Sequence, residues 1–220
     1  MVVGPVWGLS FVFTTTSAQN FNSSKLDSLF NILSANNKYM GNVAVAQNGK
    51  TIYVANGEDN SVSVIDIKNR KVLETLNCAL YPNAPAGSAT NGVALSTDEK
   101  TLYIANADNN CLAVFDVTVV GNSKSKGFIP VGWYPTSVKV VGSKIYVTNG
   151  KGFTSFANPL GPDPYNQNAQ MAVQKGLLKN TKEVQYIGGL MKGTLSIINT
   201  PSEKQLGLYS AAVYENTPYT

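Results

Sequence analysis

From residue 43 onward, apolar and polar residues alternate with a period of two, in short runs separated by turn residues. Side chains of a β-strand point alternately to its two faces, so each run predicts a strand with one face toward a core. Asn48-Gly49, between the first two runs, is a strong signal for a hairpin turn. The predicted strands span residues 43–46, 51–55, 61–67, 71–76, 92–96, 101–105, 111–117, 127–131, 136–141, 144–148 and 193–198. We therefore expect an all-β fold for most of the chain.

The strand pattern is repeated. The segment KTIYVAN at Lys50–Asn56 returns as KTLYIAN at Lys100–Asn106, and KIYVTN at Lys144–Asn149 begins a third copy. The central tyrosines of the three copies are 50 and 43 residues apart. Four predicted strands fill each complete period. A strand-built repeat of this length predicts the four-stranded antiparallel blades of a β-propeller.

The number of copies limits the architecture. We expect a partial β-propeller of about three four-stranded antiparallel blades over residues 41–205, in which an insertion at 150–185 interrupts the third blade. Propellers typically close with four to eight blades, so three blades leave sheet edges bare. Either several chains complete a ring, or the sequence is part of a longer propeller, which we favour.

Both ends of the chain depart from the strand pattern. Residues 1–19 are largely apolar and finish in small residues, as a signal-peptide remnant would. In residues 20–40, apolar positions at i, i+3, i+4 and i+7 predict a short N-terminal helix. Residues 206–220 form a C-terminal exit segment, with a short helix predicted over residues 205–214.

The composition excludes several kinds of catalytic site, metal site and partner. The chain contains no histidine, which excludes Ser-His-Asp and Cys-His catalysis and histidine-ligated metals. The net charge of +4 comes from scattered lysines without a cluster, so we expect no nucleic-acid partner. No stretch is long and apolar enough to span a membrane. Cys78 and Cys111 are too few for a zinc site, and we expect Cys111 to be a small buried apolar side chain. Whether the two cysteines pair stays open.

Polar residues recur where the predicted second strands end. Asn56, Asn106 and Asn149 occupy equivalent positions in the three copies. A ring of amides facing a ligand is one interpretation. We favour a structural role in which each side chain hydrogen-bonds its own backbone at the turn. Trp133 and Tyr134, just before the third copy, are expected to pack between blades.

Acidic residues lie in the predicted turns. Asp66 and Asp116 end the third strands and are expected to stabilise the turns that follow. Glu58, Asp59 and Asp108 lie in hairpins that would converge on one face of a propeller. Carboxylates in such loops are weak candidate ligands for a hard cation such as Ca²⁺, but exposed turn acids are far commoner. We expect no metal and no cofactor.

The insertion in the third copy begins with a loop rich in glycine and lysine. It lacks the spacing of a Walker A phosphate-binding loop. Insertions of this length commonly contact a neighbouring domain. The predicted interaction loop contains Gly150, Lys151, Gly152, Ser155 and Asn158.

The repeats resemble the YVTN-type β-propeller family, through Tyr146-Val147-Thr148-Asn149 and the matching copies over roughly residues 41–200. The stretches LYPNAPAGSATN, GFIPVGWYPTSV and YVTNGKGFTSFANPLGPDP are similar to a bacterial exported subfamily. In that subfamily, propellers precede an alkaline-phosphatase-like phosphoesterase domain. The resemblance implies a periplasmic or secreted protein. Its expected partners are a phosphoesterase domain or neighbouring propeller blades.

The first 50 residues resemble a different class. FNSSKLDSLFNILSANNKYMGNVAVAQNGKTIY is similar to the N-terminus of a β-lactamase-class serine hydrolase precursor, which implies a fusion or a truncated reading frame. Ser123-Lys124-Ser125-Lys126 spells the S-x-x-K motif of that class. It lies in a polar inter-strand segment without the other motifs, so we expect no catalytic residue there.

Two functions follow from these observations. We expect a non-catalytic β-propeller scaffold or recognition module, a fragment of an exported protein that normally carries a phosphoesterase domain, and no enzymatic activity of this chain. The alternative is a propeller-type lactonase-like hydrolase, in which acids and a lysine or arginine converge on the channel. The absence of histidine counts against the alternative.

Overall fold

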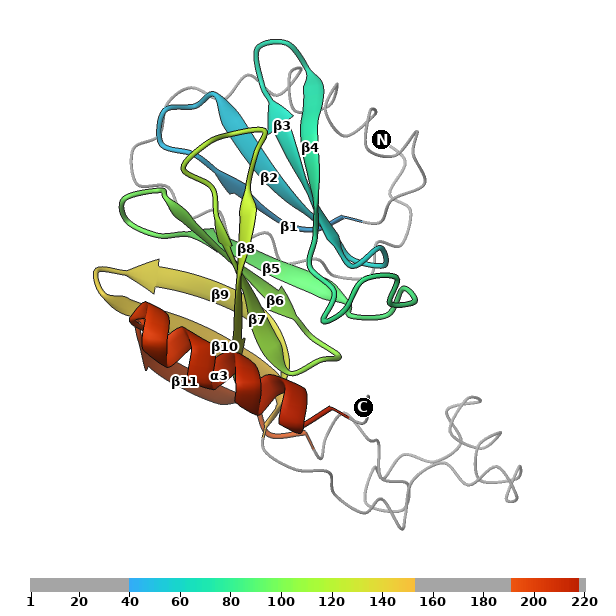
Figure 1. Ribbon diagram of the computed structural model, residues 1–220, viewed down its shortest axis with the longest axis vertical. Coiled ribbons are helices and arrows are strands. Elements are labelled where there is room, and N and C mark those ends of the chain that lie inside the picture. The colour runs from blue at the N-terminus through green and yellow to red at the C-terminus, as the bar shows by residue number, and fades with distance from the viewer. Residues whose placement is uncertain (1–39, 153–190, 218–220) are drawn as a thin grey trace, which may run out of the picture.

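The computed structural model describes residues 40–152 and 191–217 (Figure 1). Within these ranges the chain forms strands β1 to β11 in three antiparallel sheets, and the helix α3. The predicted all-β partial propeller is confirmed. The predicted N-terminal helix, the signal-peptide-like start and most of the predicted 150–185 insertion lie outside the described residues.

Each of the first two repeats forms a four-stranded blade with its strands in chain order. Blade 1 contains β1 (Met40–Val45), β2 (Thr51–Asn56), β3 (Ser61–Asp66) and β4 (Lys71–Asn77). Blade 2 contains β5 (Thr90–Leu95), β6 (Thr101–Asn106), β7 (Cys111–Asp116) and β8 (Lys124–Pro130). Blade 3 has three described strands in the order β11-β10-β9, which are β9 (Trp133–Val141), β10 (Lys144–Gly152) and β11 (Thr194–Asn199).

The blades stack face to face, with blade 2 between the other two (Figure 1). Their first strands lie side by side, because β5 packs against both β1 and β9. This is the arrangement of inner strands around a propeller axis. No helix of the described residues is long and apolar enough to cross a membrane.

Four repeated positions on the second and third strands hold the stack together. Because cross-strand partners share a face, Tyr53 and Val64 lie together on the side of blade 1 that faces blade 2. Ala55 and Val62 are the second pair on that face. The equivalent residues of blade 2 face blade 3 and are Tyr103, Ala105, Leu112 and Val114. All eight side chains are at most 2 % exposed, so the repeat motif is the packing surface between blades.

The helix α3 (Glu203–Glu215) follows β11 at the point where the other repeats have their fourth strand. The side chain of Ser202 caps its first turn by accepting a hydrogen bond from the Gln205 N–H. The predicted terminal helix is therefore confirmed, with an earlier start. The helix packs along β8, the outermost strand of blade 2. It buries Leu206 and Val213.

Hydrogen bonds to the backbone of β8 fix α3 in place. The Ser210 hydroxyl accepts a bond from the N–H of Phe128 (2.8 Å) and donates one to the Leu206 carbonyl (2.8 Å). The Tyr214 hydroxyl donates to the Leu80 carbonyl (2.8 Å), and its ring meets that of Phe128 edge-on at 5.8 Å. The helix thus covers polar backbone of the β8 edge, which would otherwise remain open.

The aspartates that end the third strands stabilise the turns, as predicted. Asp66 accepts a bond from the Asn69 N–H (2.9 Å), and Asp116 accepts one from the Thr118 N–H (2.9 Å). Backbone and side-chain bonds from Asn69 lower the pKa of Asp66. The hydroxyl and N–H of Thr118 lower the pKa of Asp116. Both groups are solvated and act as local turn residues.

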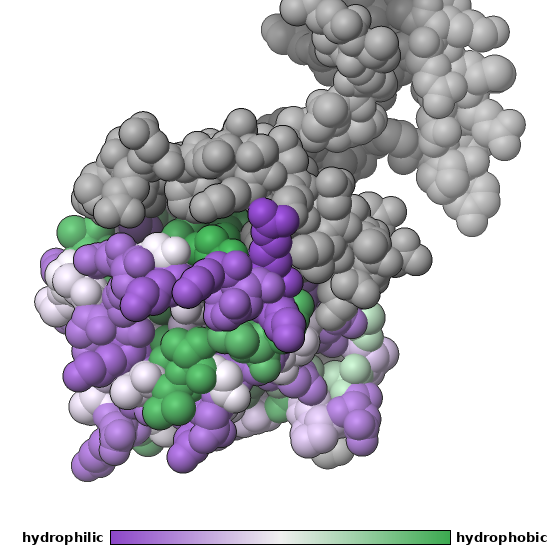
Figure 2. All heavy atoms as spheres, turned by 90° about the horizontal axis from the view of Figure 1, so that it is seen from above, coloured by the Kyte–Doolittle hydropathy of each residue, from purple (hydrophilic) through white to green (hydrophobic). Residues whose placement is uncertain are grey.

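Blade 1, uppermost in Figure 1, also carries exposed apolar side chains, Val45, Val72 and Leu73. Seen from above in Figure 2, apolar residues lie in several separate areas among hydrophilic ones. Single exposed aliphatics of this kind are ordinary on a protein surface.

Candidate functional site

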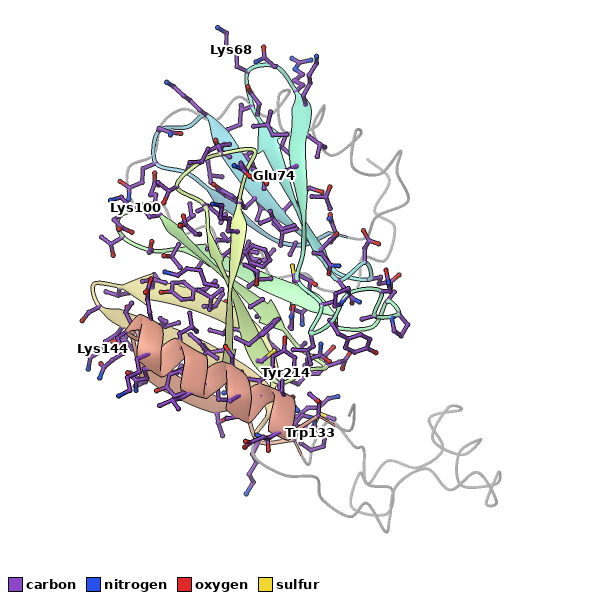
Figure 3. All side chains as sticks on the ribbon, viewed as in Figure 1. Lys68, Glu74, Lys100, Trp133, Lys144 and Tyr214 are labelled. Carbon is purple, nitrogen blue, oxygen red and sulfur yellow. The ribbon has the colours of Figure 1, made fainter. Side chains whose placement is uncertain are left out.

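The blades have two ends, and the described residues of the predicted site lie at one of them. One end carries Asn56, Asn106 and Asn149, and we call it the asparagine end. The other carries the hairpins between the first and second strands, and we call it the hairpin end. Figure 3 shows Trp133 at the asparagine end, and Lys100 and Lys144 at the hairpin end.

The repeated asparagines are structural. The side-chain N–H₂ of Asn56 donates to the hydroxyls of Ser61 (2.8 Å) and Ser63 (3.0 Å) on the neighbouring strand. That of Asn149 donates to the equivalent Ser196 hydroxyl (2.9 Å). Both asparagines are buried. The favoured structural role is therefore supported, but the main partners of these amides are side chains of the next strand, not their own backbone.

Blade 2 departs from this arrangement. The two serine positions are Cys111 and Ala113 there, and the Asn106 amide donates to the Cys78 carbonyl instead (2.7 Å). The hydroxyl of Thr90, the cross-strand partner of Asn106, is buried without a described hydrogen-bond partner, as are the amide oxygens of Asn106 and, in blade 3, Asn149. Buried polar atoms of this kind commonly hold an internal water.

A second pair of asparagines binds blades 1 and 2 to backbone that follows them in the chain. Asn60 and Asn110 adopt left-handed backbone conformations, with φ of 47° and 53°. The amide oxygen of Asn60 accepts from the N–H of Gly87 (3.1 Å) and of Ser88 (2.6 Å). The amide oxygen of Asn110 accepts from the N–H of Tyr134 (2.9 Å). Neither residue was predicted from the sequence, although both occupy the same position in the repeat.

Three charged residues occupy one equivalent position at the asparagine end. Glu58, Asp108 and Lys151 each lie two residues after the repeated asparagine. The two acids are exposed in turns. Lys151 is half-buried, with its Nζ 4.2 Å from the centre of the Tyr134 ring and 5.6 Å from that of Trp133. A cation held over aromatic rings is positioned without an ion pair. Two carboxylates and an ammonium thus come from successive blades.

The weak metal candidates do not form a cation site. Asp59 accepts a bond from the Ser61 hydroxyl (2.9 Å), which ties it to its own turn. Among the described residues, no group of three or more His, Cys, Asp or Glu side chains is placed to hold a metal.

The first three residues of the predicted interaction loop belong to a strand. Gly150, Lys151 and Gly152 are the last residues of β10, where Gly152 pairs with Trp133 of β9. The pairing of β10 with β9 continues past Asn149 through a bulge, so the strand runs on to Gly152. Ser155 and Asn158 lie outside the described residues.

The S-x-x-K segment has a structural partner. The segment was predicted to lie between strands, but its last three residues are the first residues of β8. The Ser123 hydroxyl donates to the carboxylate of Glu74 (2.6 Å), which also accepts from the Gly121 N–H (3.0 Å). Glu74, labelled in Figure 3, therefore joins β4 of blade 1 to the end of the β7–β8 connection. The Ser123 hydroxyl is thus held in a contact between blades 1 and 2.

Both cysteines are free thiols buried in the core between blades 1 and 2. Burial raises the pKa of Cys111 to about 12 and raises that of Cys78 as well. Since the thiolate is the reactive form, neither cysteine should react with a thiol reagent such as DTNB in the native protein at pH 8. Both should react in guanidinium chloride. Release of one thiol equivalent from the native protein would contradict this placement.

Comparison with solved structures finds similar chains of low identity. A protein from Lactobacillus plantarum is 20% identical over 50% of this chain and 34% of its own, with a TM-score of 0.46. A putative 6-phosphogluconolactonase from Bacteroides uniformis is 20% identical over 50% of this chain and 33% of its own, with a TM-score of 0.44. Kuenenia stuttgartiensis hydrazine synthase is 18% identical over 64% of this chain and 33% of its own, with a TM-score of 0.43.

The chain spans about a third of the length of these structures. No curated protein matches it. A family model described as "Lactonase, 7-bladed beta-propeller" matches residues 34–151. This range includes blades 1 and 2, strand β9, and strand β10 except for its last residue. Since this match covers more than half of the 220 residues, the chain belongs to the 7-bladed β-propeller lactonase family.

Proposed function

We propose that this chain contributes to the hydrolysis of a lactone. The observation that carries the proposal is the family match over residues 34–151. This favours the alternative from the sequence analysis over a scaffold without catalytic activity. The family relation concerns a seven-bladed protein, and the described residues supply three blades.

The asparagine end offers groups suited to this reaction. In lactone hydrolysis, water adds to the ring carbonyl, the ring C–O bond breaks, and the alkoxide takes a proton to give a hydroxy acid. A carboxylate such as Asp108 or Glu58 would accept the proton of the attacking water. The ammonium of Lys151 would stabilise the negative charge that develops on the carbonyl oxygen. The exposure of both acids leaves them open to water and substrate.

The test is a pH-stat assay of the purified full chain with glucono-δ-lactone, with unfolded protein to define spontaneous hydrolysis. We expect acid release above that background. Bis(p-nitrophenyl) phosphate, tested alongside, should not be cleaved. If the folded chain accelerates neither reaction, the result would favour the interpretation as a non-catalytic scaffold.

The residue assignment has its own test. Asp108→Asn and Lys151→Met should each lower kcat/KM about tenfold, since loss of one charged contact is worth roughly 1.4 kcal/mol. Lys100→Met, at the hairpin end, is the matched control and should leave kcat/KM unchanged. Equal kcat/KM values for all three variants would mean that the residues of the asparagine end take no part in the reaction. The family assignment would be unaffected.

The finer resemblance to exported, phosphoesterase-linked YVTN propellers remains a proposal. Its support is the set of sequence stretches shared with that subfamily. Fractionation of cells that produce the full-length protein would test it, with recovery in the periplasm or medium as the expected result.

A further inference from the structure

Tyr134 has a backbone conformation that both its own side chain and the following residue disfavour. Its φ is +62°, in the left-handed region that bulky residues rarely adopt. It also precedes Pro135, and the residue before a proline is restricted toward extended backbone. The N–H of Tyr134 donates to the amide oxygen of Asn110 (2.9 Å), and this bond fixes the conformation. Strained residues of this kind persist where the surrounding structure enforces them, and they cluster at functional sites.

The repeat does not require a tyrosine at this position. Strand pairing makes Ala89 the equivalent of Tyr134 in blade 2, because each residue comes just before the strand partner of the repeated asparagine. Ala89 is left-handed as well, with a φ of 47°. Blade 2 thus builds the same turn with a side chain that ends at Cβ. The fold accounts for the conformation of Tyr134 but not for its aromatic ring.

The ring of Tyr134 is not part of the core. Trp133 and Tyr134 were predicted to pack between blades, but neither belongs to a hydrophobic cluster of the described residues. Both side chains are half-buried. The contact that the structure gives both rings is with Lys151, whose Nζ lies closer to the Tyr134 ring. The ring therefore contacts a charged group of the candidate site.

The residue at the left-handed position and the charge at the site change together between blades. Two residues after the repeated asparagine, blade 3 has Lys151 and blade 2 has Asp108. The face of an aromatic ring is electronegative, so it attracts an ammonium and repels a carboxylate. Tyr134 accompanies the lysine, whereas Ala89 accompanies the aspartate. The aromatic ring occurs in the blade where the charge at the site is positive.

We propose that Tyr134 is a positioning residue, kept in a strained conformation because its ring holds the Lys151 ammonium in place at the asparagine end. This role rests on the proposed function, in which that ammonium stabilises the charge on the lactone carbonyl oxygen. A free lysine side chain has many rotamers, and fixing one of them during the reaction costs entropy. An ammonium already held over a ring is preorganised for the developing charge.

Kinetics of the full chain with glucono-δ-lactone test the positioning role. Tyr134→Gly should lower kcat/KM about tenfold, as Lys151→Met does, and should lower it little further when combined with Lys151→Met. Tyr134→Phe keeps the ring face and should restore most of the activity. Ala89→Gly, at the equivalent position of blade 2, is the matched control and should leave kcat/KM unchanged. An unchanged kcat/KM in Tyr134→Gly, additive losses in the double variant, or a failure of Tyr134→Phe to restore activity would each overturn the proposal.

Urea unfolding distinguishes a positioning role from a packing role. Glycine adopts the left-handed conformation without strain, so the unfolding midpoint of Tyr134→Gly should equal or exceed that of the unchanged chain. A ring that packs between blades would instead leave a cavity when removed. A fall of the midpoint as large as that for a core leucine truncated to alanine would assign the ring to packing and overturn the proposal.

A measurement without substrate separates this proposal from the proposed function. The lysines of the full chain are dimethylated with carbon-13 labels, which keeps their charge, and the Lys151 signal is the one that Lys151→Met removes. Methyl groups over a ring face resonate upfield. The Lys151 signal should be upfield in the unchanged chain and in Tyr134→Phe, and should lose most of that shift in Tyr134→Gly. A signal without an upfield shift would overturn the proposal. An upfield signal in a chain that hydrolyses no lactone would contradict the proposed function and support the ring as the group that holds the ammonium.

Discussion

Leu112→Ala should lower the free energy of unfolding by roughly 3 to 5 kcal/mol, the range for leucines truncated in a packed core. Leu112 is fully buried between blades 2 and 3, in the cluster that contains Tyr103, Ile129 and Val147. Its removal leaves a cavity that two packed sheets cannot close, because both are fixed by their hydrogen bonds. Urea unfolding followed by circular dichroism measures the change, with the slope of the transition as a check on two-state behaviour.

Leu195→Ala is the matched control for this prediction. It makes the same chemical change at the same position of the repeat, on a side chain that is largely exposed. We expect a change of about 0.5 kcal/mol or less, as for most surface substitutions. A comparable loss in both variants would mean that the face of blade 3 that carries Leu195 is covered in this chain.

Gly127→Ala should lower the free energy of unfolding by about 2 to 3 kcal/mol through two independent effects. Gly127 has a φ of +138°, a conformation that residues with a Cβ rarely adopt. A Cβ at this position would also overlap the Ser210 hydroxyl and touch Leu206, so that hydroxyl would have to turn away from β8. The bond from the Phe128 N–H to Ser210 would be lost with that movement.

Gly121→Ala separates the two effects. Gly121 also has a positive φ, of +85°, but a Cβ there would meet open space. It should cost only the backbone strain, about 1 kcal/mol. Near-UV circular dichroism should report displacement of Tyr214 in Gly127→Ala and not in Gly121→Ala. Equal losses and equal spectra would mean that the close approach of α3 to β8 contributes nothing.

Much of the fold follows from local sequence signals. The alternation around Tyr53 and Tyr103 identifies strands, and the copy number identifies repeated blades, because both signals depend on residues close together in the chain. The start of β8 and the end of β10 were placed less well. Gly127 breaks the alternation of β8, and the extension of β10 to Gly152 depends on pairing with Trp133 of β9. Neither effect is visible within a single strand.

The candidate site was harder to predict, because its members come from different blades. Glu58, Asp108 and Lys151 could have been grouped by counting two residues from each repeated asparagine. From the sequence, the acids were instead considered as turn residues and weak candidate ligands for a cation, and the lysine as part of a loop. The position of Lys151 over Tyr134 depends on the bulge between β9 and β10, which no local pattern reveals. Asn60 and Asn110 were missed because their partners lie more than 20 residues further along the chain, in the β4–β5 connection and at the start of β9.

The central place of blade 2 has a consequence for how the structure opens. Blade 2 is the one described blade with a packed neighbour on each face, and α3 also lies on its outermost strand. In a linear array, each unit draws stability from its nearest neighbours, so end units open at lower free energy than inner ones. Blade 2 therefore acts as the cooperative unit of this chain. Blades 1 and 3 can open locally while it persists, whereas its own opening exposes both cores and amounts to global unfolding.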